Sequence, residues 1–160
     1  MFHRLSIGLL SAALLSACGT VAPQPVAVKK TIVIPPGRQA EYDRFHYAPV
    51  VRVGDTLILS GIPAYGANTY EGKIRHMFED VKGTLEAAGA TLADVVEITT
   101  FHQDATDTVT FQKEFAEFLK VHKEYFKENY PAWTAVGTTA LLAKGAPVEM
   151  RVVAVVGAGK

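Results

Sequence analysis

The sequence predicts an α+β domain of two layers, in which two helices pack on one face of a mixed β-sheet. Three observations support this class. Short β-branched or apolar runs bounded by glycine and proline recur along the chain, two longer stretches repeat apolar residues at helical spacing, and strand-like runs separate and follow those stretches. Each helical stretch has a single apolar face, so each is expected to cover the sheet from one side.

A strand and a hairpin precede the helices. Residues 31–34 form a β-branched run that ends at two prolines, and the run VVRVGDTLILSG from Val50 has the form of a hairpin turning at Gly54 and Asp55. The intervening segment GRQAEYDRFHYAP shows little periodicity. We therefore predict a strand, a loop and a hairpin in that order.

The spacing of apolar residues predicts two amphipathic helices. Residues 74–88 repeat apolar side chains at helical intervals. Asn68 and Glu71 stand in the positions of a capping box before this helix, and Gly89 stands in the position of a C-terminal stop. The second helix begins at Asp107 and ends before a proline. Its apolar face comprises Phe111, Phe115, Phe118, Leu119, His122 and Phe126.

Three strands complete the predicted sheet. Residues 95–101 lie between the two helices, and residues 134–142 and 148–156 follow the second helix. The final GAGK follows a strand but precedes no helix that could receive a phosphate. We therefore predict that these last residues form a frayed tail.

The first residues have the plan of an export signal. Residues 1–18 contain Arg4, then an apolar stretch, then small residues before Cys18. The ending LSAC resembles the lipobox of bacterial lipoproteins, which implies cleavage before Cys18 and acylation of that cysteine; an ordinary secretory signal is the alternative. Residues 19–30 are expected to form a flexible tether and residues 31–160 a single domain.

These features suggest a location and exclude some partners. Gly19 after the cysteine favours the outer membrane, so we expect a protein anchored by lipid at the cell envelope and facing the periplasm, or a secreted one. The 16 basic and 16 acidic residues balance, so nothing in the charge favours nucleic acid.

The histidines lack the spacing of metal ligands, and neither a metal nor another cofactor is expected. His122 is predicted to be a satisfied core or interface histidine.

A carboxylate in the last strand is the first candidate functional group. Alternate residues of a strand point to opposite faces, so Glu149 and Arg151 share one face of the run VEMRVVAVV, and both faces are largely apolar. An ionised carboxylate there is costly unless it is paired, hydrogen-bonded or reached by water. Glu149 is therefore either the ion-pair partner of Arg151 or another cation, or a functional carboxylate in a cleft.

Three segments, in this order, resemble a known family. YAPVVRVGDTLILSGIP, DVKGTLEAAGATLADVVEITTF and YPAWTAVGTTALLAKGAPVEMRVVAV are similar to the signature segments of the Rid family, the imine and enamine deaminases also called RidA/YjgF and, by an older name, L-PSP endoribonucleases. The resemblance covers Tyr47 to Val155. It implies a chorismate-mutase-like fold, a homotrimer, and clefts for a small-molecule ligand between subunits.

The resemblance also implies site residues. Glu149 aligns with the family's catalytic glutamate, which positions the water that attacks an imine carbon, and a carboxylate so placed acts as a general base. Tyr47 matches the tyrosine of the family's Tyr-Ser-Gln segment, although that segment reads YAP here. Ser60 and Gly61 match a Ser-Gly pair that lines the cleft. Gln112 stands where the family has a helix asparagine near the site.

One position departs from the family in a way that affects the substrate. Active deaminases carry an arginine in a Pro-Ala-Arg-Ser segment, where it binds the substrate's carboxylate, whereas this chain reads PAWT with Trp133 there. An indole offers one donor and no charge, so it does not replace a bidentate clamp. Trp133 either stacks on a ligand or packs in the interior. Arg151 either substitutes for the missing cation or neutralises Glu149.

Two functional hypotheses follow. In the first, the chain is an exported RidA-like trimer that hydrolyses an imine or enamine other than the usual amino-acid-derived ones. In the second, it is a non-catalytic trimer that binds a small molecule at the cell envelope, with Glu149 and Tyr47 as ligand contacts. Under both hypotheses the lipid on Cys18 provides the membrane contact, and no nucleic acid is bound.

Overall fold

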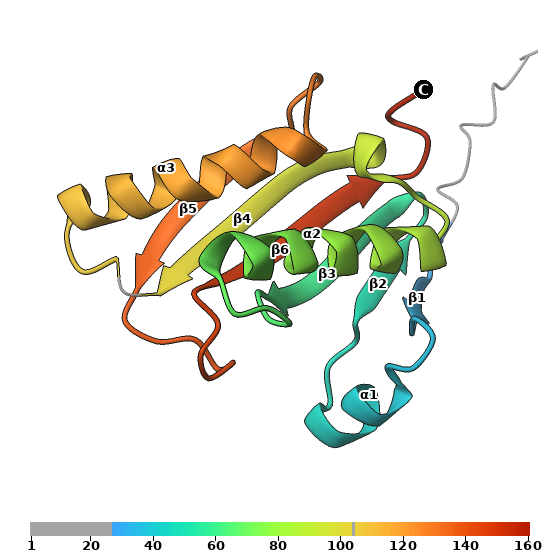
Figure 1. Cartoon of the computed structure of the whole chain (residues 1–160). Helices are drawn as coiled ribbons and strands as arrows, with labels where there is room; N and C mark the ends of the chain where they lie inside the picture. Colours follow the sequence, from blue (N-terminus) through green and yellow to red (C-terminus); the bar gives the residue numbers. More distant parts are fainter. Residues whose placement is uncertain (1–26, 104) are drawn as a thin grey trace, which may run out of the picture.

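The computed structural model describes residues 27–103 and 105–160, which form the expected α+β domain of two layers (Figure 1). One six-stranded sheet has the strand order β1-β2-β3-β6-β4-β5. Its neighbouring strands are antiparallel except for the parallel pair β4 and β5. The elements are β1 (Lys30–Val33), α1 (Gln39–Phe45), β2 (Val50–Val53), β3 (Thr56–Pro63), α2 (Tyr70–Ala87), η1 (Leu92–Asp94), β4 (Val95–Gln103), α3 (Thr108–Tyr125), β5 (Ala132–Thr138) and β6 (Val148–Val155).

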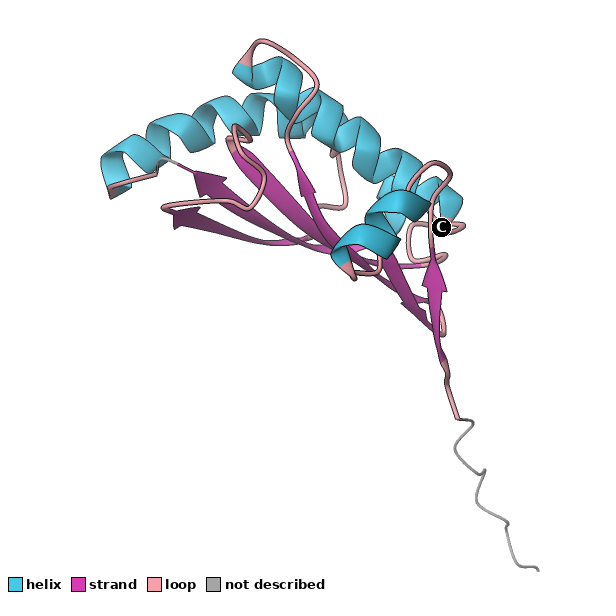
Figure 2. Ribbon diagram, turned by 90° about the horizontal axis from the view of Figure 1, so that it is seen from below, coloured by secondary structure: helices cyan, strands magenta, loops and turns pink. Residues whose placement is uncertain are grey.

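The two long helices lie on the same face of the sheet (Figure 2). As a result, burial alternates along β6. Val148, Met150 and Val152 are buried toward the helices, while Glu149 and Arg151 lie on the opposite face. Burial of the apolar faces of α2 and α3 against one side of the sheet forms the core. We call the opposite side the uncovered face.

The predicted strands, the hairpin and both long helices are present, although β5 ends at Thr138 and not at residue 142, and the segment predicted to be a loop contains α1. This seven-residue helix has no buried residue, so it leaves no apolar periodicity in the sequence. Local side-chain contacts support it instead, with Arg38 paired to Glu41 and Gln39 hydrogen-bonded to Asp43.

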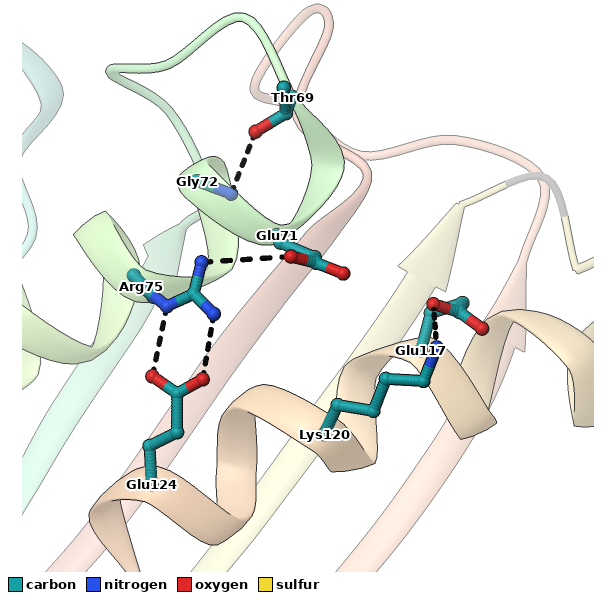
Figure 3. Close-up of polar contacts among 7 residues, drawn as sticks. All are labelled: Thr69, Glu71, Gly72, Arg75, Glu117, Lys120 and Glu124. Carbon is teal, nitrogen blue, oxygen red and sulfur yellow. Dashed lines mark hydrogen bonds and ion pairs between the residues drawn. The ribbon is translucent and has the colours of Figure 1, made fainter.

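The predicted start of the first long helix is wrong by one residue. The hydroxyl of Thr69, and not the side chain of Asn68, accepts the hydrogen bond from the backbone N–H of Gly72 at 3.1 Å (Figure 3). Glu71 pairs with Arg75 at 3.7 Å. Gly89 has a φ of +82°, which suits its predicted place just after the helix.

The prediction of a frayed C-terminal tail is also wrong, because hydrogen bonds to Asp94 fix these last residues in place. The carboxylate of Asp94 accepts backbone hydrogen bonds from Gly157 at 2.9 Å and from Gly159 at 3.1 Å. Hydrogen bonds from Gly159 and Thr91 lower the pKa of Asp94. The partners are more than 60 residues apart in the chain, so no local pattern reveals them.

The predicted signal segment, residues 1–18, and most of the predicted tether lie outside the described residues. Among the helices of residues 27–103 and 105–160, none is long and apolar enough to cross a membrane.

Candidate functional site

Glu149 lies on the uncovered face, directly over Gly61 of the neighbouring strand β3. The pairing of β3 with β6 shifts between Leu59 and Ile62, and this irregularity places Gly61 under the carboxylate. A Cβ added at Gly61 would overlap the side chain of Glu149. The glycine is thus required for the close approach of the carboxylate to the backbone.

The carboxylate of Glu149 is half-buried and has no ion-pair or hydrogen-bond partner among residues 27–103 and 105–160. Burial raises its pKa above the usual range of a glutamate. The alternative of an ion pair between Glu149 and Arg151 is not formed, because Nη1 of Arg151 donates to Oε1 of Glu97 on β4 at 3.2 Å. A carboxylate with a raised pKa and open acceptor positions is suited to exchange protons with a ligand or water.

The residues before β2 run beside Gly61. The backbone N–H of Ser60 donates to the carbonyl of Pro49 at 3.0 Å, and its hydroxyl donates to the carbonyl of Ala48 at 2.7 Å. Tyr47 directly precedes these two residues, so its backbone adjoins the part of β3 that holds Ser60 and Gly61. Ser60 acts here as a support for this backbone.

Tyr65, which no sequence pattern indicates, also belongs to this region. It follows β3 in a loop, and burial raises the pKa of its phenol, with further contributions from the charges of Glu149 and Glu41. Glu41 lies on α1 and Glu149 on β6, both far from Tyr65 in the sequence, so no local signal marks Tyr65. We call Glu149, Gly61, Tyr47 and Tyr65 the Glu149 site.

Two residues expected in the site, Trp133 and Gln112, lie elsewhere in the fold. Trp133 pairs in register with Ile98 on the helix-covered face. It stacks on His122 with ring centres 4.4 Å apart, and packs against aromatic residues of α3. Gln112 is exposed on α3. The structure therefore favours the packing alternative for Trp133 and does not bring Trp133 or Gln112 to Glu149 within one chain.

A buried polar network lies beneath α3, on the opposite face from Glu149. Nδ1 of His102 lies 2.6 Å from Oε2 of Glu114, and its Nε2 lies 2.8 Å from the hydroxyl oxygen of Thr100. The indole N–H of Trp133 donates to the same Thr100 oxygen at 3.0 Å, and the hydroxyl of Tyr70 donates to Glu114. The indole N–H of Trp133 fills one acceptor position of the Thr100 hydroxyl, and Nε2 of His102 shares a hydrogen bond with the same hydroxyl.

The network places one proton between His102 and Glu114. Burial lowers the pKa of His102 to about 4 and raises that of Glu114 to about 7, so burial disfavours the charged form of both groups. The stabilising effect of Glu114 is lost as pH rises through its folded pKa, and that of His102 is lost as pH falls through its own. The two groups therefore change the free energy of unfolding in opposite directions as pH varies, and their effects largely cancel between about pH 4.5 and 6.5.

The order Thr100, His102 and Glu114 has the form of a hydrolase triad, but the oxygen that would attack is inaccessible. Thr100 and His102 have no exposed surface. Beside them, a hollow of about 420 Å³ is lined by Thr69, Tyr70, Glu71, Glu114 and Glu117. The charges at its rim are paired, because Arg75 contacts Glu71 and Lys120 contacts Glu117 (Figure 3). We therefore assign the network a structural role between α2, α3 and β4.

His122 is buried as predicted, but its Nε2 has no hydrogen-bond partner in the described part of the chain. Burial, with a smaller effect of Lys123, lowers its pKa to about 4. Because the pKa of His122 is lower in the folded state, its contribution to stability is fully present above the unfolded-state pKa of about 6.5 and is lost as pH falls toward 4.

We expect the difference in unfolding free energy between the parent and His122→Phe to change by about 2–3 kcal/mol from pH 7 to pH 4. Urea unfolding at several pH values measures it, and a constant difference would contradict the assignment.

The domain has helices on one face of a mixed sheet and, on the other face, a half-buried glutamate that has no partner among the residues the structure describes. These features define a small α+β protein with its candidate site on the sheet. The chain belongs to the family described as Endoribonuclease L-PSP, the RidA/YjgF/RutC family, whose model matches residues 38–156.

Relatives and solved structures agree with this family. The chain is 34% identical over 133 residues to the RutC family protein YjgH of Escherichia coli K12, covering 79% of this chain and 95% of that protein. It is 34% identical over 117 residues to a 2-iminobutanoate/2-iminopropanoate deaminase of Dermatophagoides farinae, covering 69% of this chain and 85% of that one. The solved structure of Protein YJGH has a TM-score of 0.68 at 32% identity, covering 81% of this chain and 98% of that chain.

The site shows no metal-binding arrangement within residues 27–103 and 105–160, where no three His, Cys, Asp or Glu side chains are grouped to hold an ion. The functional groups of the Glu149 site are thus a carboxylate and two phenols.

Proposed function

We propose that this protein hydrolyses an imine or enamine, with Glu149 as the general base, and that its substrate differs from the usual amino-acid-derived imines. The half-buried carboxylate over Gly61, with a raised pKa and no partner in the described chain, is the observation that carries this proposal. A similar protein is named as a 2-iminobutanoate/2-iminopropanoate deaminase. The substrate is expected to differ because the arginine of the family's Pro-Ala-Arg-Ser segment is replaced by Trp133.

The proposed reaction needs one residue that takes and returns a proton. Glu149 removes a proton from water as its oxygen bonds to the carbon of the protonated C=N group, giving an amino alcohol. The C–N bond then breaks, the nitrogen leaves with the proton returned by Glu149, and the hydroxyl loses its proton to give the carbonyl product. For a primary imine the products are one carbonyl compound and ammonia. Because its pKa is raised, Glu149 holds the transferred proton more readily than an exposed glutamate would.

The test is ammonia release by the chain lacking residues 1–18, supplied with imines generated in situ from several amino acids and from uncharged amines. Release well above the uncatalysed rate for at least one imine is expected. If no imine is hydrolysed while an imine-like ligand still binds, the second hypothesis, a non-catalytic small-molecule-binding protein, is favoured; the missing arginine is the observation behind it.

We propose further that three copies assemble through their uncovered faces, which completes a cleft around each Glu149. Apolar residues cross this face in register, since Ile32 pairs with Val51, Val51 with Ile58 and Ile58 with Val153. Ile32 retains 42% exposure in the single chain. Light scattering is expected to give three times the chain mass for the parent and the single-chain mass for Ile58→Asp. A parent that remains a single chain would contradict the assembly.

We also propose that a lipid on Cys18 anchors this assembly at the cell envelope, facing the periplasm. The lipobox-like ending LSAC supports this, and several anchors in one assembly would bind a membrane together. In a bacterial host, the parent is expected in the membrane fraction and Cys18→Ser in the soluble fraction. Equal distribution of the two would oppose the anchor.

A further inference from the structure

Arg38 and Glu41 form a close ion pair at the start of α1. Nε and Nη2 of Arg38 donate to Oε2 of Glu41 at 3.0 and 2.8 Å, and the hydroxyl of Tyr47 donates to the same oxygen at 3.0 Å. Burial acts to raise the pKa of Glu41, but these hydrogen bonds outweigh it and the pKa is lowered. The guanidinium of Arg38 thus already holds a carboxylate, the ligand that arginine binds best.

This pair borders the Glu149 site. Tyr47, which contacts Glu41, directly precedes the two residues that are hydrogen-bonded to Ser60, and the residue after Ser60, Gly61, lies under the carboxylate of Glu149. Tyr65 is within electrostatic reach of both Glu41 and Glu149. A small molecule over Gly61 would therefore have the carboxylate of Glu149 beside it, and Tyr47 would connect it to the pair of Arg38 and Glu41.

Neither Arg151 nor the family's arginine position supplies the site with a cation that could bind a substrate's carboxylate. Arg151 is paired with Glu97, and the family's arginine position holds Trp133, which packs under α3. An anionic ligand would have to displace Glu41 from three hydrogen bonds and would then lie near two carboxylates, which is unfavourable. An uncharged ligand would neither compete with Glu41 for Arg38 nor be repelled by the two carboxylates.

We propose that Glu41 is an internal carboxylate ligand of Arg38, and that this pairing excludes carboxylate-bearing substrates and selects uncharged C=N compounds. As a statement about substrates, the inference rests on the proposed function of Glu149. Arg38 and Glu41 are specificity-determining residues, and neither takes part in proton transfer.

The test compares pyruvate with pyruvamide, a carboxylate and an uncharged amide of the same shape, by calorimetric titration of the full-length protein. Glu41→Gln keeps an oxygen that accepts from Arg38 and Tyr47 but removes the competing charge. We expect it to raise the affinity for pyruvate at least about tenfold and to change that for pyruvamide by less than about twofold. Adding Arg38→Gln to this variant should abolish the gain.

Glu41→Ala is a second variant with the same expected gain, in case the glutamine itself occupies Arg38. Thermal unfolding of each variant checks that α1 and the sheet remain folded. The inference is overturned if the parent binds pyruvate as tightly as both Glu41 variants do, or if the gain persists without Arg38.

Binding does not require turnover, so this test and the test of the proposed function fail separately. A parent that hydrolyses no imine, but whose Glu41 variants gain Arg38-dependent pyruvate binding, refutes the proposed reaction and leaves the role of Glu41 standing. A parent that hydrolyses imines, and whose Glu41 variants gain nothing, does the reverse.

Discussion

Glu149→Gln is expected to lower kcat/KM for imine hydrolysis by about 10²–10⁴-fold, the usual contribution of a general base. The amide has nearly the same shape and still fits over Gly61, but it does not accept a proton from water. Steady-state ammonia release at several pH values measures the effect. The parent's rate should also fall as pH drops below the raised pKa of Glu149, and the variant should lack this dependence.

Glu97→Gln is the matched control, because it makes the same change on the neighbouring strand. Glu97 is exposed and contacts Arg151. Its substitution should leave the rate within about twofold, since an exposed ion pair contributes little. If Glu149→Gln retains the parent rate, or if Glu97→Gln loses as much, Glu149 is not the base.

Thr100→Val is expected to lower the free energy of unfolding by about 2–6 kcal/mol, the largest stability effect we anticipate. Valine has the shape of threonine but no oxygen, so the indole N–H of Trp133 would lose its acceptor and Nε2 of His102 would lose its hydrogen-bond partner in the core. Each buried polar group left without a partner costs about 1–3 kcal/mol.

Thr100→Ser separates this effect from packing, because it keeps the oxygen and removes a methyl group. We expect it to cost about 1 kcal/mol. Trp133 is the single tryptophan of the sequence, so its fluorescence follows urea unfolding and also reports the loss of its hydrogen bond. Equal stabilities of Thr100→Val and Thr100→Ser would show that the network contributes little.

Local patterns are sufficient to predict most of the fold. The apolar spacing of α2 and α3 and the alternation in β6 are periodic signals, and the hairpin between β2 and β3 turns at Gly54 and Asp55 as expected. Helix α1 leaves no such signal because it buries nothing, and the ordered C-terminus leaves none because Asp94 lies far away in the sequence.

The candidate site is only partly predictable. The position of Glu149 in an apolar strand, together with the family resemblance, marks it as a candidate from the sequence alone. Arg38, Glu41 and Tyr65 carry no such signal, because each is a common surface residue in an aperiodic segment.

The side of the sheet on which each residue lies follows from strand alternation, and the class of the domain follows from the spacing of its apolar residues. Which residues come into contact does not follow from these local patterns. The pairing of Arg151 with Glu97, the approach of Glu149 to Gly61, and the burial of Trp133 against His122 each join different strands or helices. Such contacts depend on strand register and helix packing, which are set by the burial of the whole core and by no single segment.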